Sequence, residues 1–171
     1  PLLGYGSKAF TISVIESALR MSKGKISQAS LEELIQMGKQ LLLMPCTPLP
    51  GVKETLEKLQ GYKLVLLTKG ELQEQENKIK RSGLEHYFSH IEIVSNKDES
   101  TFRQLSDKLG IAAERMLSVG NSFKSDIAPA LSVGYHAIHI PFHVVWELEQ
   151  TDEFEHPRLM RIERFEEIGL P

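Results

Sequence analysis

Three groups of polar residues follow apolar stretches of the chain, and two of them suit the binding of phosphate. Thr68, Lys69 and Gly70 follow the apolar residues 64–67, and a hydroxyl beside a glycine amide can hold phosphate oxygens. Lys97 comes soon after the apolar residues 91–94, where its ammonium could neutralise a phosphate or an anionic intermediate. Each also has a plainer interpretation, because a threonine can cap a strand end and loop lysines are usually solvated.

The third group suits a metal ion. Residues 116–119 are followed by Gly120 and Asn121, and Asp126 comes five residues after Asn121. A glycine turn followed by oxygen-bearing side chains is typical of a magnesium site, because Mg²⁺ prefers oxygen ligands. The alternative for Asp126 is structural, since a carboxylate at the start of a helix complements the helix dipole.

The elements that position these residues are predicted to alternate between strands and helices. Apolar runs bounded by glycine and proline predict four strands and four helices after residue 50. Such alternation favours a parallel sheet with helices on both faces, a Rossmann-like α/β core, in which ligands bind beyond the carboxyl ends of the strands. The predicted strands are residues 63–68, 91–94, 116–120 and 136–140, and the predicted helices are residues 52–59, 72–81, 101–109 and 125–131.

The start of the chain has a different pattern. Residues 10–21 and 31–42 carry apolar side chains at helical spacing, and Ser30 with Glu33 forms a possible capping box. The proline-rich stretch that follows disfavours helix and predicts a linker. We therefore expect a helical hairpin over residues 1–47 and the α/β core over residues 48–171.

The end of the chain mixes charged and apolar residues. The tail after Pro157 is expected to add an edge strand and a docked helix, and Trp146 is expected to pack against this tail. His136, His139 and His143 are interpreted as ordinary polar or partly buried histidines, because His136 and His139 point to opposite faces of a strand.

Composition narrows the classes of partner. Lys and Arg total 20 against 23 Asp and Glu, a formal charge of −3, so no excess of basic residues predicts nucleic-acid or anionic-membrane binding. The single cysteine, Cys46, agrees with a reducing compartment. No apolar run is long enough to span a bilayer, and the sequence carries no signal for oligomeric state. We expect a cytoplasmic protein.

The three groups together, in this order and at these strand ends, resemble the second, third and fourth motifs of the haloacid dehalogenase-like hydrolase superfamily. Residues before Pro48 would then be the helical cap inserted after the first motif. The resemblance implies Mg²⁺ and an aspartyl-enzyme intermediate, usually a phosphoaspartate. It assigns phosphoryl binding to Thr68 with Lys69 and Gly70, charge stabilisation to Lys97, and metal binding to Asn121 and Asp126.

The chain departs from the family pattern at two points. Asn121 stands where the fourth motif has an aspartate, so a neutral amide replaces a carboxylate. The first motif, an apolar strand followed by Asp-x-Asp, is absent, since residues 1–6 before the first helix contain no acid. We therefore expect a chain without its nucleophile, inactive alone, whose central strand is missing between residues 63–68 and 116–120.

The resulting expectation is a hydrolase truncated before its nucleophile. In full-length form it would be a Mg²⁺-dependent phosphatase that acts on a small phosphorylated metabolite through an aspartyl-phosphate. One alternative is a non-catalytic binding module, favoured by Asn121 and the missing first motif but opposed by Thr68, Lys97 and Asp126. Another is dehalogenation at carbon, which does not need the metal, so magnesium dependence separates the two enzymatic alternatives.

Overall fold

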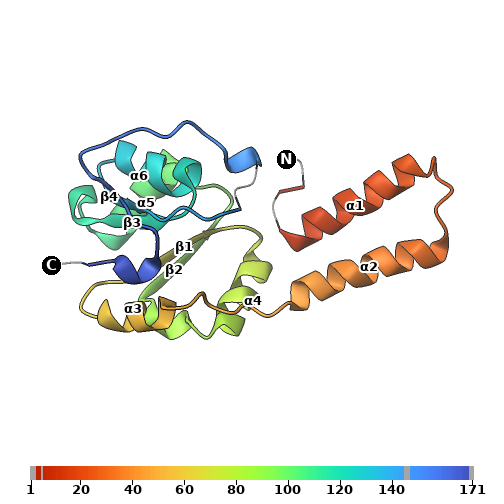
Figure 1. Ribbon diagram of the computed structural model, residues 1–171, viewed down its shortest axis with the longest axis horizontal. Coiled ribbons are helices and arrows are strands. Elements are labelled where there is room, and N and C mark those ends of the chain that lie inside the picture. Colours follow the sequence, from red (N-terminus) through yellow and green to blue (C-terminus); the bar gives the residue numbers. More distant parts are fainter. Residues whose placement is uncertain (1–2, 5, 145–146, 170–171) are drawn as a thin grey trace. The chain divides into compact units, whose positions relative to one another are not determined.

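The protein alternates between helices and strands along the chain, and its computed structural model describes residues 3–4, 6–144 and 147–169 (Figure 1). Trp146 lies outside the described residues. The chain divides into two compact units, residues 1–48 with 64–95 and residues 49–63 with 96–171. The division into a cap over residues 1–47 and a core over residues 48–171 stays a prediction.

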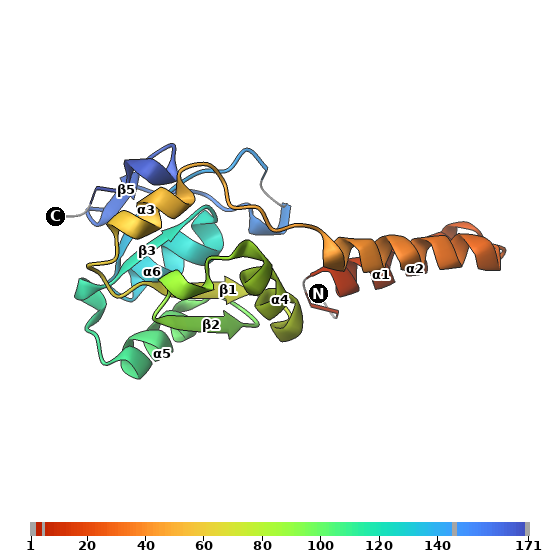
Figure 2. The same cartoon turned by 90° about the horizontal axis from the view of Figure 1, so that it is seen from below.

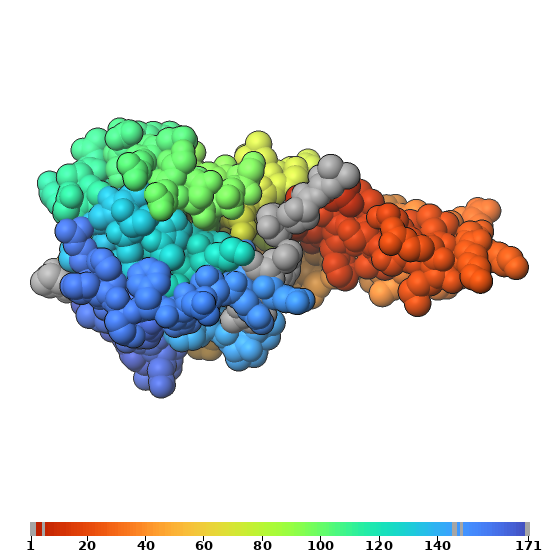
Figure 3. Space-filling view, turned by 90° about the horizontal axis from the view of Figure 1, so that it is seen from above, coloured from red at the N-terminus to blue at the C-terminus, as the bar shows by residue number. Residues whose placement is uncertain are grey.

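The first unit begins with a helical hairpin. Helices α1 (Ser7–Met21) and α2 (Gln28–Leu43) pack side by side, as Figure 3 shows in red and orange. Gly38 permits this close approach, because a Cβ at that position would collide with the side chain of Thr11. The predicted capping box at Ser30 is wrong. The helix begins three residues earlier than predicted, at Gln28, and Ser27 caps it by accepting a hydrogen bond from the Ser30 amide at 3.1 Å.

The rest of the first unit is a parallel strand–helix–strand arrangement (Figure 2). Strand β1 (Val65–Lys69) leads into helix α4 (Leu72–Ser82), a short 3₁₀ turn (Glu85–Tyr87) and strand β2 (His90–Val94). The two strands pair in parallel over their full length. The predicted strands and helix are confirmed with ends shifted by one or two residues.

The second unit holds a three-stranded parallel sheet in the order β3-β4-β5. The predicted edge strand in the tail is confirmed as β5. The helices are α3 (Val52–Lys58), α5 (Glu99–Leu109) and α6 (Ala128–Ser132), the strands are β3 (Leu117–Gly120), β4 (His136–His139) and β5 (Leu159–Arg161), and 3₁₀ turns span Ala113–Arg115, Glu147–Glu149 and Phe165–Glu167.

The helix predicted over residues 125–131 is wrong in its start and its form. A π-helical turn, η3 (Phe123–Ile127), precedes α6. Pro129 accounts for the break, because proline has no amide to donate within a helix and is tolerated only in a first turn. Ser122 caps the π-turn by accepting from the Ser125 amide at 3.0 Å.

The core of the second unit packs this turn against the sheet. Phe123, Ile127, Leu131 and Ala137 form one buried apolar cluster. Tyr135 is also buried, and its hydroxyl donates to the Phe102 carbonyl oxygen at 2.8 Å. The turn after β3, which carries Asn121 and Asp126, is thus built directly on the core.

The sheet topology confirms the predicted class, α/β with parallel strands. Within residues 3–4, 6–144 and 147–169, β1 pairs only with β2, and β3 pairs only with β4. A central strand between β1 and β3 therefore stays a prediction. No helix formed by the described residues is long and apolar enough to cross a membrane.

Candidate active site

The second unit brings Lys97 and Asp126 together. Lys97 Nζ lies 2.6 Å from Asp126 Oδ1, and both side chains are largely shielded from water, with 16% and 11% exposed. A charged pair at this distance in a partly buried setting is stronger than a surface ion pair. The two residues are 29 positions apart in the sequence, and together they form a small polar centre with fixed charges.

The turn after β3 fixes the position of the Asp126 carboxylate. Its second oxygen, Oδ2, accepts from the Ser122 amide at 3.0 Å, and Ser118 Oγ donates to the Asp126 carbonyl at 2.8 Å. Gly120 is required for this approach, because a Cβ there would collide with the Asp126 side chain. The glycine that the sequence places at the strand end therefore makes room for the carboxylate.

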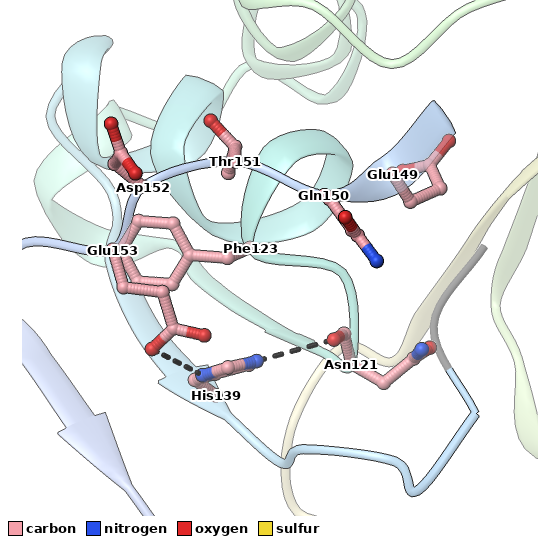
Figure 4. Close-up of a pocket in the computed structure, with 8 residues that line it drawn as sticks. All are labelled: Asn121, Phe123, His139, Glu149, Gln150, Thr151, Asp152 and Glu153. Carbon is pink, nitrogen blue, oxygen red and sulfur yellow. Dashed lines mark hydrogen bonds and ion pairs between the residues drawn. The ribbon is translucent and has the colours of Figure 1, made fainter. Parts of the chain in front are cut away.

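Asn121 lies at the edge of a cavity of about 640 Å³ in the same unit. Figure 4 shows this cavity between the turn after β3, the end of β4 and residues 149–153. Asn121 is exposed, whereas its backbone carbonyl oxygen lies 3.2 Å from His139 Nε2. Polar and acidic side chains dominate the lining, which consists of Asn121, Phe123, His139, Glu149, Gln150, Thr151, Asp152 and Glu153.

His139 is the buried member of the predicted histidine set, and His136 is exposed, as opposite faces of a strand require. His139 Nδ1 is buried without a hydrogen-bond partner, and the nearest carboxylate oxygen, Glu153 Oε2, is 3.8 Å away. The ring stacks edge-on against Phe123 with 5.5 Å between centroids. This arrangement is that of a core histidine held by packing.

The donor set does not fit a magnesium ion by itself. Asp126 is its one carboxylate, and both of its oxygens are occupied, by the Lys97 ammonium and by the Ser122 amide. Asn121 adds only a neutral amide. Mg²⁺ sites in proteins usually combine one or two carboxylates with bound waters and with phosphates of the substrate. Within the part of the chain that the structure describes, no three His, Cys, Asp or Glu side chains gather where they could hold a metal.

The predicted phosphate-binding residues lie in the first unit, Thr68 and Lys69 at the end of β1 and Gly70 in the turn to α4. Thr68 Oγ1 donates to Gln75 Oε1 at 3.0 Å, and the Gly70 amide donates to the Val94 carbonyl at 3.1 Å. Gly70 has φ 153° and a Cβ there would press on Gln75. Helix α4 begins at this turn, and Glu71 caps its amides.

Two partners of these residues had no signal in the sequence. Gln75 holds the Thr68 hydroxyl from the first turns of α4. Glu149 accepts hydrogen bonds from the hydroxyls of Ser122 and Ser125, 27 and 24 residues earlier. Neither belongs to a motif with recognisable spacing, although Gln75 lies only one turn into the helix that follows Thr68.

Comparison with known proteins gives consistent results. A sequence model of the haloacid dehalogenase-like hydrolases matches residues 10–134. A haloacid dehalogenase-like family hydrolase from Xanthomonas campestris has a similar structure, with a TM-score of 0.84 and 33% sequence identity. The match covers 94% of this chain and 65% of that one.

Two curated relatives carry phosphatase names. N-acylneuraminate-9-phosphatase from Rattus norvegicus is 30% identical over 129 residues, which cover 71% of this chain and 52% of that protein. Glyceraldehyde 3-phosphate phosphatase from Methanothermobacter thermautotrophicus is 31% identical over 100 residues, covering 53% of this chain and 43% of that protein. This chain therefore spans about half the length of the curated relatives that it matches.

Proposed function

The chain belongs to the haloacid dehalogenase-like hydrolases, and we propose that the whole protein is a phosphatase for a small phosphorylated metabolite. The observation that carries the proposal is the Lys97–Asp126 pair, with 2.6 Å between Nζ and Oδ1 beside the turn after β3. A shielded cation at the carboxyl end of a parallel strand suits the stabilisation of a phosphoryl group in transfer. The phosphatase names of two curated relatives support the same reaction class.

The proposed chemistry has two displacements at phosphorus. An aspartate oxygen bonds to phosphorus as the alcohol oxygen of the substrate leaves and takes a proton. Water then bonds to the same phosphorus and releases inorganic phosphate and the free aspartate. Lys97 would counter charge on the phosphoryl oxygens in both steps, and Thr68, Lys69 and Gly70 would line the phosphate site.

We propose that this chain is inactive without an added nucleophile. Its four aspartates are Asp98, Asp107, Asp126 and Asp152, and no two are separated by a single residue. In this proposal an Asp-x-Asp motif, the family's nucleophile with its acid/base partner, would be supplied from outside these 171 residues. Mg²⁺ as cofactor belongs to the same proposal, with Asn121 and Asp126 as ligands and further carboxylates from that motif.

The proposed partner is a small molecule and the proposed compartment is the cytoplasm. The polar cavity beside Asn121 is within the usual size for a small-molecule site. A cytoplasmic location is part of the proposal, on the basis of a single cysteine in the sequence. Neither feature suggests a nucleic-acid partner.

The proposal is tested by assaying the complete protein and the 171-residue chain on a panel of small phosphate esters with Mg²⁺ and with EDTA. We expect Mg²⁺-dependent release of phosphate by the complete protein and none by the chain alone. Release of halide from a 2-haloacid, without phosphate release, would instead assign the dehalogenase reaction. Binding of phosphate esters without turnover by the complete protein would assign the non-catalytic alternative, which Asn121 favours.

A further inference from the structure

Glu149 makes two short hydrogen bonds that no sequence motif predicts. It ends the 3₁₀ turn Glu147–Glu149, and its Oε2 atom accepts from Ser122 Oγ at 2.5 Å and from Ser125 Oγ at 2.6 Å. Hydroxyl-to-carboxylate bonds of this length are charge-assisted and are stronger than bonds between neutral groups. One carboxylate therefore gathers two hydroxyls of the turn after β3.

These two serines belong to the loop that presents the proposed catalytic groups. The Ser122 amide donates to Asp126 Oδ2 at 3.0 Å, and the Ser125 amide donates to Ser122 Oγ at 3.0 Å. Asp126 in turn binds Lys97. A continuous chain of hydrogen bonds thus runs from Glu149 through Ser122 to Asp126 and Lys97.

Glu149 also reaches the loop from outside it. Residues 121–127 form a tight turn that Lys97 and His139 contact from outside, and the segment after β4 adds a further external anchor through Glu149. Glu149 lines the cavity with Asn121, as Figure 4 shows. The neighbouring Glu147 occupies the same 3₁₀ turn but is exposed, and the cavity lining does not include it.

We propose that Glu149 is a positioning residue, which holds the loop of residues 121–126 so that Asn121 and Asp126 keep a fixed geometry toward the substrate. The catalytic consequence rests on the proposed phosphatase function, whereas the effect on the loop does not. Glu149 touches no reacting atom in this assignment and acts through Ser122 and Ser125. A loop held by two charge-assisted bonds is preorganised before substrate arrives, and preorganisation governs transition-state stabilisation.

The first arm of the test measures the loop itself, in the complete protein and without substrate. Amide hydrogen exchange is recorded at Ser122 and Ser125 for the wild type, Glu149→Ala, Glu149→Gln and the control Glu147→Ala. We expect Glu149→Ala to speed exchange at both amides by about tenfold or more, because local opening becomes easier when its anchoring bonds are lost. Glu149→Gln should rescue part of the protection, because its amide oxygen still accepts. Glu147→Ala should match the wild type.

The second arm measures turnover of a phosphate ester by the same proteins. We expect Glu149→Ala to lower kcat by about tenfold while KM changes less than about threefold, and Glu149→Gln to recover part of the loss. A double variant with Ser125→Ala should lose little more than Glu149→Ala alone, because the two residues act through one hydrogen bond. Glu147→Ala should leave both constants unchanged.

The outcomes separate the two proposals. Unchanged exchange in both Glu149 variants would overturn the assignment, and so would faster exchange with unchanged kcat. If Glu149→Ala does not fold, the folded Glu149→Gln variant and the single variant Ser125→Ala, which removes one of the two hydroxyl donors, decide the matter by the same criteria. A wild type that is folded but hydrolyses no phosphate ester would refute the phosphatase proposal, and the exchange arm alone would then decide whether Glu149 holds the loop.

Discussion

Replacing Glu74 should be among the most damaging single changes in the first unit. Its side chain is 3% exposed, and it accepts three hydrogen bonds from Ser7, two from the amide at 2.9 and 3.2 Å and one from the hydroxyl at 2.8 Å. Lys78 Nζ lies 3.2 Å from the same carboxylate. The carboxylate thereby satisfies the first amide of α1, which has no partner within its own helix.

The expected magnitude follows from these contacts. Glu74→Ala leaves the Ser7 amide and hydroxyl without their acceptor, and hydrogen bonds to a charged group contribute about 1.5–3 kcal/mol each, so we expect a loss of about 3–5 kcal/mol in the free energy of unfolding. Lys78 adds little, since its side chain is 41% exposed and can be hydrated. Glu74→Gln keeps an acceptor oxygen and should cost about 1–2 kcal/mol.

The assay is urea unfolding followed by circular dichroism, with the exposed Glu76→Ala on the same helix as control. The control should lie within about 0.5 kcal/mol of the wild type, as surface substitutions do. A Glu74→Ala protein that unfolds within 1 kcal/mol of this control, on the accuracy that such extrapolations reach, would refute the reasoning. That result would mean that the Ser7 amide and hydroxyl can bond to water in place of Glu74 without loss of stability.

The pH dependence of stability gives an independent test of the contribution of Glu74. Burial raises the pKa of Glu74, but hydrogen bonds from Ser7 and Lys78 outweigh it, and the net pKa lies below the ordinary 4.5. A lowered pKa means that the stabilisation is complete above pH 4.5 and is lost as the pH falls through the folded-state value. Glu71 and Asp98, with pKa values lowered by hydrogen bonds from Lys8 and from the Thr101 amide, act in the same direction. The difference in the free energy of unfolding between the wild type and Glu74→Gln, measured at each pH, therefore isolates the contribution of Glu74.

Three further substitutions, one in the first unit and two in the second, test the assigned roles. In an active form of the protein, Lys97→Ala should lower kcat by about a hundredfold or more, as loss of one preorganised charge does, and Lys69→Ala should do much less. Equal effects would show that the third motif is misassigned. Tyr135→Phe should lower the free energy of unfolding by about 1–3 kcal/mol, because the Phe102 carbonyl loses its buried donor. Urea unfolding that matches the wild type would contradict this.

Much of the fold could be predicted because its signals are local. Apolar runs of strand length ended by glycine or proline located β1, β2, β3 and β4 to within two residues, and glycine caps located the ends of α4 and α5. The errors were also local in origin. The spacing of Ser30 and Glu33 favoured a capping box at Ser30, whereas the helix is capped by Ser27.

The contacts that complete the site could not be predicted, because they join residues far apart in sequence. Glu149 meets Ser122 and Ser125 across 27 and 24 positions, and Glu74 meets Ser7 across 67. A glutamate in a polar stretch gives no local indication of its hydrogen-bond partner, since most such residues are solvated. The sequence indicates which residue types stand at strand ends, whereas the three-dimensional packing decides which of them are held in place.

The burial of the strands bears on the proposed central strand. Strand β4 has ladder partners on both sides, and three of its four residues are buried. In the described residues, β1 and β3 each have one ladder partner, and none of their residues is buried. Apolar parallel strands normally lie between two neighbours and are covered on both faces.

A strand that supplies the nucleophile beside β1 and β3 would account for both the burial and the chemistry. In the complete protein we expect the amides of Leu67 and Val119, which face away from β2 and β4, to exchange much more slowly than in the 171-residue chain, because ladder bonds protect amides from exchange. The amides of β4, whose ladders are already complete, should be slowed less. Equal exchange of β1 and β3 in both proteins would show that no strand is added there, and the nucleophile would then have to reach Lys97 by another route.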